Sequence, residues 1–196
     1  MSRYVRNLSK ILNENPRFFD NINIEQFAMD VASSFLEAQR ITNVSCVNLT
    51  PECIGYDEKE NKFLICDWER IIRYRAESCE SSSCEFERYL LKILKNDFHD
   101  SKYLSPEILK CINDTSFIYA DSHKSFGFSL GLVILDILNM SALRESLQFP
   151  TSNENDHTEK LQKILSKTRT TEKMKEVLEK MLSFDPSSRF SPKARS

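Results

Sequence analysis

Residues 125–140 read SFGFSLGLVILDILNM, and large apolar side chains occupy most positions of this stretch. They do not follow one stripe at helical spacing but fall on every side of a helix, which indicates a helix surrounded by protein. A membrane span requires about 20 apolar residues, whereas Asp136 and Asn139 interrupt this run. The stretch therefore predicts the central core helix of the domain.

Composition limits the classes of protein to consider. With 196 residues and 40% hydrophobic content, the chain suits one globular domain. The net charge of -2, from 27 basic and 29 acidic residues, gives no electrostatic reason to expect nucleic acid or a membrane as partner. The start, MSRYVRNLSK, lacks the apolar core of a secretory signal. The six cysteines form no C-x-x-C units, so we expect reduced thiols and a cytoplasmic location.

Apolar spacing predicts further elements on both sides of the core helix. Residues 3–13 are predicted as a short helix with Val5 and Leu8 on its inner face. A longer helix follows, capped by Asn23. The polar turn at residues 57–61 lies between two strand-like segments and predicts a small β-hairpin. Near the carboxyl end, Thr170 or Thr171 caps another helix that packs on the core.

Five short segments of the sequence contain recognisable motifs: NLTPECI at 48–54, CDWE at 66–69, YLSPEIL at 103–109, FGFSLGLVILDIL at 126–138 and MLSFDPSSRF at 181–190. They are similar, in that order, to the eukaryotic protein kinase motifs DLKPENI, DFG, APE, DxWSLGxxL and LxxDPxxR. The resemblance implies that residues 1–196 form a mainly α, kinase carboxy-lobe-like domain with a small β-hairpin. The chain opens at a helix that in kinases follows the hinge, so the amino-terminal lobe is expected to be absent.

The resemblance also implies one structural ion pair. Arg189, in FDPSSRF, matches the kinase Arg that pairs with the Glu of APE, which is Glu107 here. A buried carboxylate without its partner costs several kcal/mol. We therefore expect this pair to support the fold, and we assign it no catalytic role.

The chain departs from the kinase pattern where phosphoryl transfer needs charged groups. Asn48 stands at the catalytic Asp, Thr50 at the Lys and Cys53 at the magnesium-binding Asn, so only Asp67 of the DFG-like CDWE remains. An amide is not a base, a hydroxyl carries no positive charge, and a thiol is a poor ligand for magnesium. The resemblance therefore implies a catalytically inactive pseudokinase without cofactor or metal. Gly55, at the position beneath adenine, makes nucleotide binding doubtful on shape as well.

Residues 70–104 form an expanded activation-segment-like insertion. Within it, apolar residues at helical spacing predict an amphipathic helix: Phe86, Tyr89, Leu90, Ile93 and Leu94. This stripe either covers the domain's own surface or docks a partner protein. The three histidines, His99, His123 and His157, are far apart and in polar sequence, so no metal or catalytic cluster is expected.

The sequence therefore predicts an inactive kinase-like domain that acts as a protein-interaction or scaffold module. It is expected to bind protein partners, not nucleic acid or membrane, and not to function as a free monomer. Two alternatives remain open. One is a divergent phosphotransferase that borrows an amino-terminal lobe from another chain and uses Asp67 alone for metal. The other is a structural subunit of a large assembly.

Overall fold

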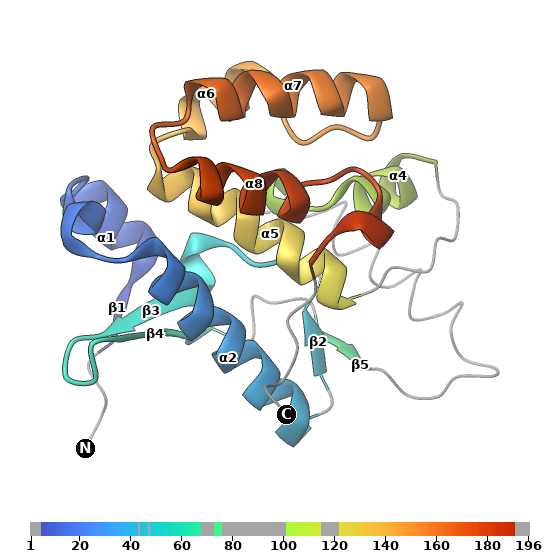
Figure 1. The fold of residues 1–196 in the computed structure, drawn as a ribbon. Helices are drawn as coiled ribbons and strands as arrows, with labels where there is room; N and C mark the ends of the chain where they lie inside the picture. The colour runs from blue at the N-terminus through green and yellow to red at the C-terminus, as the bar shows by residue number, and fades with distance from the viewer. Residues whose placement is uncertain are drawn as a thin grey trace.

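The structure is a computed structural model that describes residues 5–42, 44–46, 48–67, 73–75, 101–114 and 122–190. Within these residues the fold is mainly helical, with a three-stranded antiparallel sheet and a separate pair of strands. Helix α5 runs through the middle, with α8 and α7 on one side and α2 and the sheet on the other (Figure 1). None of the described helices has the length and apolar character that crossing a bilayer would require.

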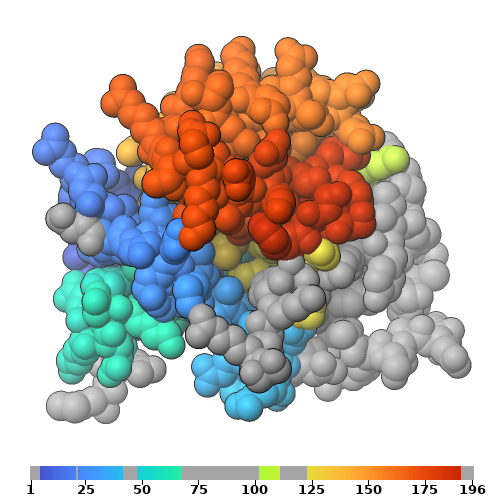
Figure 2. All heavy atoms as spheres, in the orientation of Figure 1, coloured from blue at the N-terminus to red at the C-terminus, as the bar shows by residue number. Residues whose placement is uncertain are grey.

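Helix α5 (Ser122–Ile137) confirms the predicted core helix. Every side chain from Ser125 to Ile137 is buried, and only small parts of the helix reach the surface on the face shown in Figure 2. The ring of Phe126 stacks on Phe35 of α2 (Ile24–Thr42), with centroids 4.0 Å apart. Burying a large side chain of this kind stabilises a fold by roughly 1.5 to 3 kcal/mol, so α5 organises the core.

Two glycines on α5 allow other segments of the protein to approach the helix closely. A Cβ atom added at Gly131 would lie 3.0 Å from Leu182, and one added at Gly127 would lie 3.0 Å from the carbonyl oxygen of Phe190. Glycine inside a helix costs about 1 kcal/mol relative to alanine. Here the loss is offset by close packing of α8 (Glu172–Met181) and the segment after it against α5.

The prediction of one helix over residues 3–13 is wrong at its start. Val5–Asn7 forms strand β1, which pairs antiparallel with β3 (Ile54–Asp57). Helix α1 (Leu8–Glu14) begins only afterwards, where the Asn7 side chain accepts a hydrogen bond from the Lys10 amide. A β-branched valine before a capping asparagine favours this arrangement.

The predicted β-hairpin is confirmed. Strand β3 pairs with β4 (Lys62–Ile65) in the register Ile54 to Ile65, which gives the sheet order β1-β3-β4. The outer edge of β4 faces α2. There the amide of Phe63 donates to Asp30 Oδ2 at 3.1 Å and the amide of Ile65 donates to Ser34 Oγ at 3.0 Å. Two side chains one helical turn apart therefore satisfy the free amides of this strand.

A second strand pair joins β2 (Val44–Cys46) to β5 (Arg73–Arg75) in antiparallel register. The remaining described elements are the 3-10 turns η1 (Phe18–Asn21), η2 (Pro51–Cys53), η3 (Ser101–Tyr103) and η4 (Pro186–Ser188), and helices α4 (Pro106–Asp114), α6 (Ser141–Ser146) and α7 (Glu154–Lys167). The predicted caps are present, since Asn23 accepts from the Glu25 amide and Thr171 from the Met174 amide. Helices α6 and α7 were not predicted.

Candidate functional site

The loop at residues 48–53 is enclosed by protein. Asn48, Thr50 and Cys53 each have fully buried side chains, with 0% exposure. The Thr50 hydroxyl lies 3.4 Å from the Cys53 sulfur, and the Cys53 amide donates to the Thr50 carbonyl oxygen at 3.0 Å. The side chains at these three positions are therefore part of the packed interior, and none of them reaches solvent.

Asp67 lies next to this loop because the hairpin brings the two segments together. The amide of Cys66 donates to the Cys53 carbonyl oxygen at 2.9 Å, and that of Asp67 approaches the same oxygen at 3.5 Å. Burial, and then the nearby Asp67 carboxylate, raise the pKa of the Cys66 thiol. Cys66 forms no disulfide bond, and the raised pKa keeps its thiol neutral at physiological pH.

Gly55 sits where another segment fills the space of its missing side chain. A Cβ atom added at Gly55 would lie 2.1 Å from Val5 Cγ1 and 3.1 Å from the sulfur of Cys66. Contacts under about 3.0 Å do not occur between real Cβ atoms and their neighbours. Strand β1 lies beside β3 in the same sheet, and its Val5 side chain packs over Gly55, so only glycine fits at this position.

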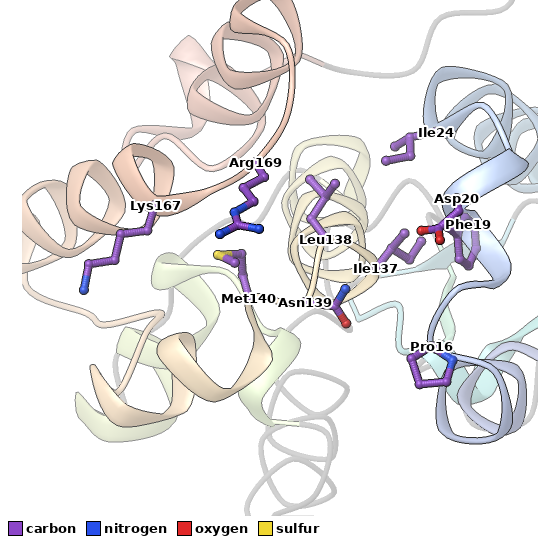
Figure 3. Close-up of a pocket in the computed structure, with 10 residues that line it drawn as sticks. All are labelled: Pro16, Phe19, Asp20, Ile24, Ile137, Leu138, Asn139, Met140, Lys167 and Arg169. Atoms are coloured by element: carbon purple, nitrogen blue, oxygen red, sulfur yellow. The ribbon is translucent and has the colours of Figure 1, made fainter.

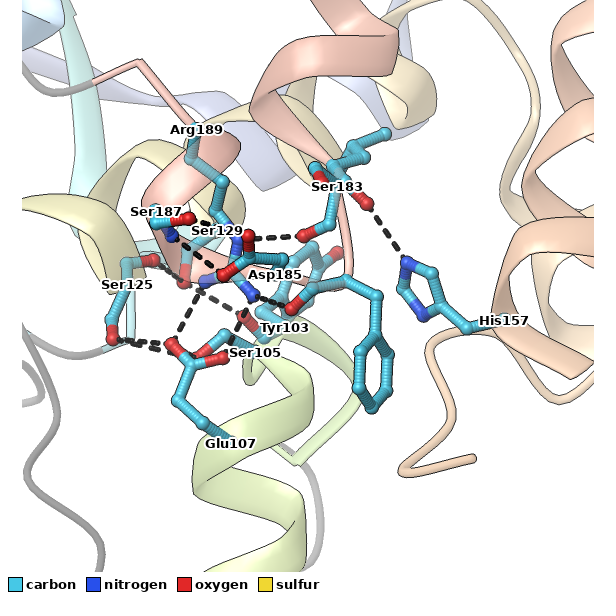
Figure 4. A network of polar contacts seen from close by, with 12 residues as sticks. Tyr103, Ser105, Glu107, Ser125, Ser129, His157, Ser183, Asp185, Ser187 and Arg189 are labelled. Carbon is cyan, nitrogen blue, oxygen red and sulfur yellow. Dashed lines mark hydrogen bonds and ion pairs between the residues drawn. The ribbon is translucent and has the colours of Figure 1, made fainter. Parts of the chain in front are cut away.

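The ion pair predicted between Glu107 and Arg189 is present in the structure. Arg189 Nη1 donates to Glu107 Oε1 and Nη2 donates to Oε2, both at 2.8 Å. Both residues are buried, and they are 82 positions apart in the chain. The two parallel hydrogen bonds, visible in Figure 4, fix the start of α4 against the segment after η4.

Hydroxyl and carbonyl groups complete this network. The Ser105 and Ser125 hydroxyls donate to Glu107 Oε1 at 2.6 and 3.0 Å, and Arg189 also donates to the carbonyl oxygens of Ser183 and Phe184. Burial alone would raise the pKa of Glu107, but hydrogen bonds and charge from Arg189 hold it below its ordinary value. The pair is therefore ionised, and both of its side chains make further hydrogen bonds, as a buried ion pair requires.

A second buried ion pair was missed at the sequence level. Arg144 on α6 binds both carboxylate oxygens of Asp136 on α5 at 2.8 and 2.9 Å, and its side chain is 1% exposed. The Tyr103 hydroxyl donates to Asp136 Oδ2 at 2.6 Å, and the Arg144 guanidinium lies 5.2 Å from the Tyr103 ring centre. Burial and the Asp136 charge raise the pKa of Tyr103 far above its ordinary value. Asp136 is a charged residue inside an otherwise apolar helix, and this feature of the sequence could have indicated a buried partner.

The expectation that the histidines lie in polar surroundings is wrong for His157. Its ring is fully buried, 4.6 Å from the Phe149 ring and 5.5 Å from the Phe184 ring. Its Nε2 lies 2.8 Å from the Leu182 carbonyl oxygen (Figure 4), so Nε2 carries the proton. Burial lowers the pKa of His157, with the Leu182 hydrogen bond opposing it. His123 contacts Gln39 on another side of the fold.

Parts of the predicted site lie outside the described residues. These are the proposed docking stripe Phe86, Tyr89, Leu90, Ile93 and Leu94, most of the 70–104 insertion, and His99. Across the described ranges, no group of three or more His, Cys, Asp or Glu side chains is arranged to hold a metal ion. Neither a protein-family model nor a curated protein sequence matches the chain.

Proposed function

We propose that this chain is a catalytically inactive protein kinase-like domain, built on the carboxy-lobe plan, that acts as a protein-interaction or scaffold module. The order of its elements supports the kinase resemblance: a buried loop, a hairpin, the YLSPE helix α4, the core helix α5 and the Arg189 segment. The paired Glu107 and Arg189 support it further, because the resemblance implied that these two distant residues meet.

One observation carries the proposed loss of catalysis. Asn48, Thr50 and Cys53 stand where a kinase needs a base, a cation and a magnesium ligand, and all three side chains are fully buried. A buried amide cannot accept a proton from a substrate hydroxyl. A thiol that is hydrogen-bonded to the Thr50 hydroxyl is a poor replacement for an oxygen ligand of magnesium. Both the chemistry and the accessibility of these groups argue against phosphoryl transfer.

The packing around Gly55 argues separately against nucleotide binding. Val5 lies against this glycine, with its Cγ1 atom where a side chain on residue 55 would begin. In the alignment with kinases, residue 55 supplies the apolar surface beneath the adenine ring. The Val5 side chain that occupies this space leaves little room for a base. The free thiol at Cys66 is in keeping with the proposed cytoplasmic location.

A thermal-shift measurement on the full chain tests the proposal. We expect no change in Tm between buffer and millimolar ATP with magnesium. Any ligand that binds only the folded state must stabilise it, by about 2.7 kcal/mol at 100 times its Kd. The matched variant is Asp67→Ala, because Asp67 is the one aligned magnesium ligand that remains. Stabilisation by ATP and magnesium that disappears in Asp67→Ala would support the phosphotransferase alternative instead.

A further inference from the structure

A pocket of about 400 Å³ lies where three segments distant in sequence meet at the carboxyl end of α5. The connection between α1 and α2 forms one side, the residues that end α5 form the floor, and the end of α7 forms the other side (Figure 3). It shares no residue with the loop at 48–53. The pocket is therefore separate from the residues on which the proposed function rests.

The floor of the pocket is mostly apolar, with Asn139 as its one polar residue, and it is held in place. Helix α5 ends in a tight turn in which the Asn139 amide donates to the Asp136 carbonyl oxygen and the Met140 amide donates to that of Leu135. Asn139 has a φ of 60°, the left-handed conformation that ends many helices. This turn fixes Leu138 and Met140, which line the pocket.

The side of the pocket formed by the connection between α1 and α2 is also held in place by packing. Phe19 lines the pocket and packs against two buried aromatic rings, 5.6 Å from Phe27 and 5.7 Å from Phe63 between ring centres. Ile24, the first residue of α2, lies beside it in the pocket wall (Figure 3). The apolar surface is therefore formed before any ligand arrives, which lowers the entropic cost of binding.

Charged residues surround this apolar surface. Lys167 is the last residue of α7 and Arg169 lies two positions after it. Both are exposed, and within the described part of the chain neither forms an ion pair. The Arg169 guanidinium points toward Met140, whereas Lys167 extends away from the floor (Figure 3). Asp20, across the pocket, is the single carboxylate of the lining. The lining therefore carries one excess positive charge, and its best-placed cation faces the apolar floor.

We propose that this pocket binds an acidic peptide segment of a partner protein. One large apolar side chain of the segment enters between Phe19 and Leu138, and a neighbouring carboxylate binds the Arg169 guanidinium through two hydrogen bonds. The volume suits one or two side chains, while the charged residues around it remain exposed to solvent. These features fit a side chain carried by a larger body better than a small molecule, which a protein normally encloses.

Selection of a random decapeptide library displayed on phage against the intact chain tests the proposal. We expect the selected peptides to carry Leu, Ile, Phe or Met within two positions of Asp or Glu. A selected peptide, synthesised with a fluorescent label, should bind at least tenfold more weakly to Arg169→Glu in fluorescence anisotropy. The matched control is Lys163→Glu, which makes the same charge change at an exposed position on α7 outside the pocket and should leave Kd within twofold.

Three results would overturn the proposal: no enriched motif, an enriched motif that is basic or uncharged, or equal binding by Arg169→Glu and the unmodified chain. Circular dichroism melts of both variants show whether the fold is intact, and both positions are exposed, so we expect unchanged Tm. Vesicles of phosphatidylserine and phosphatidylcholine form a separate arm. Binding to these vesicles that depends on Arg169, with no peptide selected, would assign the pocket to a lipid surface and contradict a peptide ligand.

Discussion

Arg189 and Glu107 are joined by two parallel hydrogen bonds of 2.8 Å in a buried setting, although 82 positions separate them in the chain. The carboxylate also accepts from Ser105 and Ser125, and the guanidinium lies 4.8 Å from the Phe128 ring centre. This pair thereby connects α4, α5 and the segment after α8 at one point. Its energetic role can be separated from that of ordinary surface charges.

A double-mutant cycle measures that role. Glu107→Ala and Arg189→Ala should each destabilise the domain by roughly 3 to 5 kcal/mol, because each leaves a buried charge without its partner. The double variant should cost less than the sum. Urea denaturation gives the free energies. The exposed pair Lys175 and Glu172 is the control, with an expected coupling of at most about 1 kcal/mol. Additive effects at Glu107 and Arg189 would show that the buried pair is not energetically coupled.

Gly55→Ala tests whether Val5 fills the space at this position. The added methyl group would overlap Val5 Cγ1, and overpacking of this kind costs about 1 to 3 kcal/mol. Val5→Ala removes the overlapping atom, so the double variant should recover part of the stability lost in Gly55→Ala alone. Chemical denaturation of the four proteins gives the comparison. No recovery in the double variant would mean that Val5 does not pack over Gly55 in solution.

His157 makes stability depend on pH in a defined direction. Its pKa is lowered in the folded state by burial, while in the unfolded chain it lies near 6.5. The unfolded state therefore binds the proton first, so the free energy of unfolding is highest above about pH 6.5 and falls as pH decreases through the lowered pKa. His157→Gln should flatten this dependence between pH 5 and 7, as followed by urea denaturation at each pH. An unchanged slope in His157→Gln would assign the dependence to other groups.

The next prediction is that the full chain associates through, or with the help of, the apolar stripe predicted within residues 86–94. Such a stripe needs a cover, from this domain or from another protein, and we expect the full chain to associate rather than remain a free monomer. The double variant Leu90→Glu, Ile93→Glu distinguishes two arrangements. If the stripe docks on a partner, the variant should lose partner binding and keep its fold. If the stripe packs against the domain itself, the variant should unfold. Circular dichroism and multi-angle light scattering distinguish these outcomes. A monodisperse monomer at high concentration, with no partner co-purifying from cells, would contradict association.

Elements that are specified by residues close together in the sequence were predicted correctly, whereas elements that depend on distant residues were missed. The core helix α5 was predictable because apolar residues on all its sides allow only a buried position. The Thr171 cap and the hairpin turn at 57–61 were predictable for the same reason, since each is specified within a few residues. Strand β1 was missed because Val5 pairs with Asp57, which lies far along the chain.

The missed parts of the candidate site depend on contacts between elements. Arg144 reaches Asp136 only because the turn after α5 reverses the chain, and no local pattern fixes that turn's direction. His157 has polar neighbours in sequence, yet the rings around it come from other segments. Its helix, α7, had a usable signal that was overlooked: His157, Leu161, Ile164 and Leu165 share one face at helical spacing.

The contact between α2 and β4 has a consequence for how this protein can assemble. The outer edge of a sheet is a template on which foreign strands add, by peptide augmentation or by aggregation. On β4, the amides of Phe63 and Ile65 are already bonded to Asp30 and Ser34, so an incoming strand finds no free donors there. Replacing Asp30 and Ser34 by alanine would leave these two amides without their acceptors. The helix thus closes one end of the sheet to polymerisation and directs association to other surfaces.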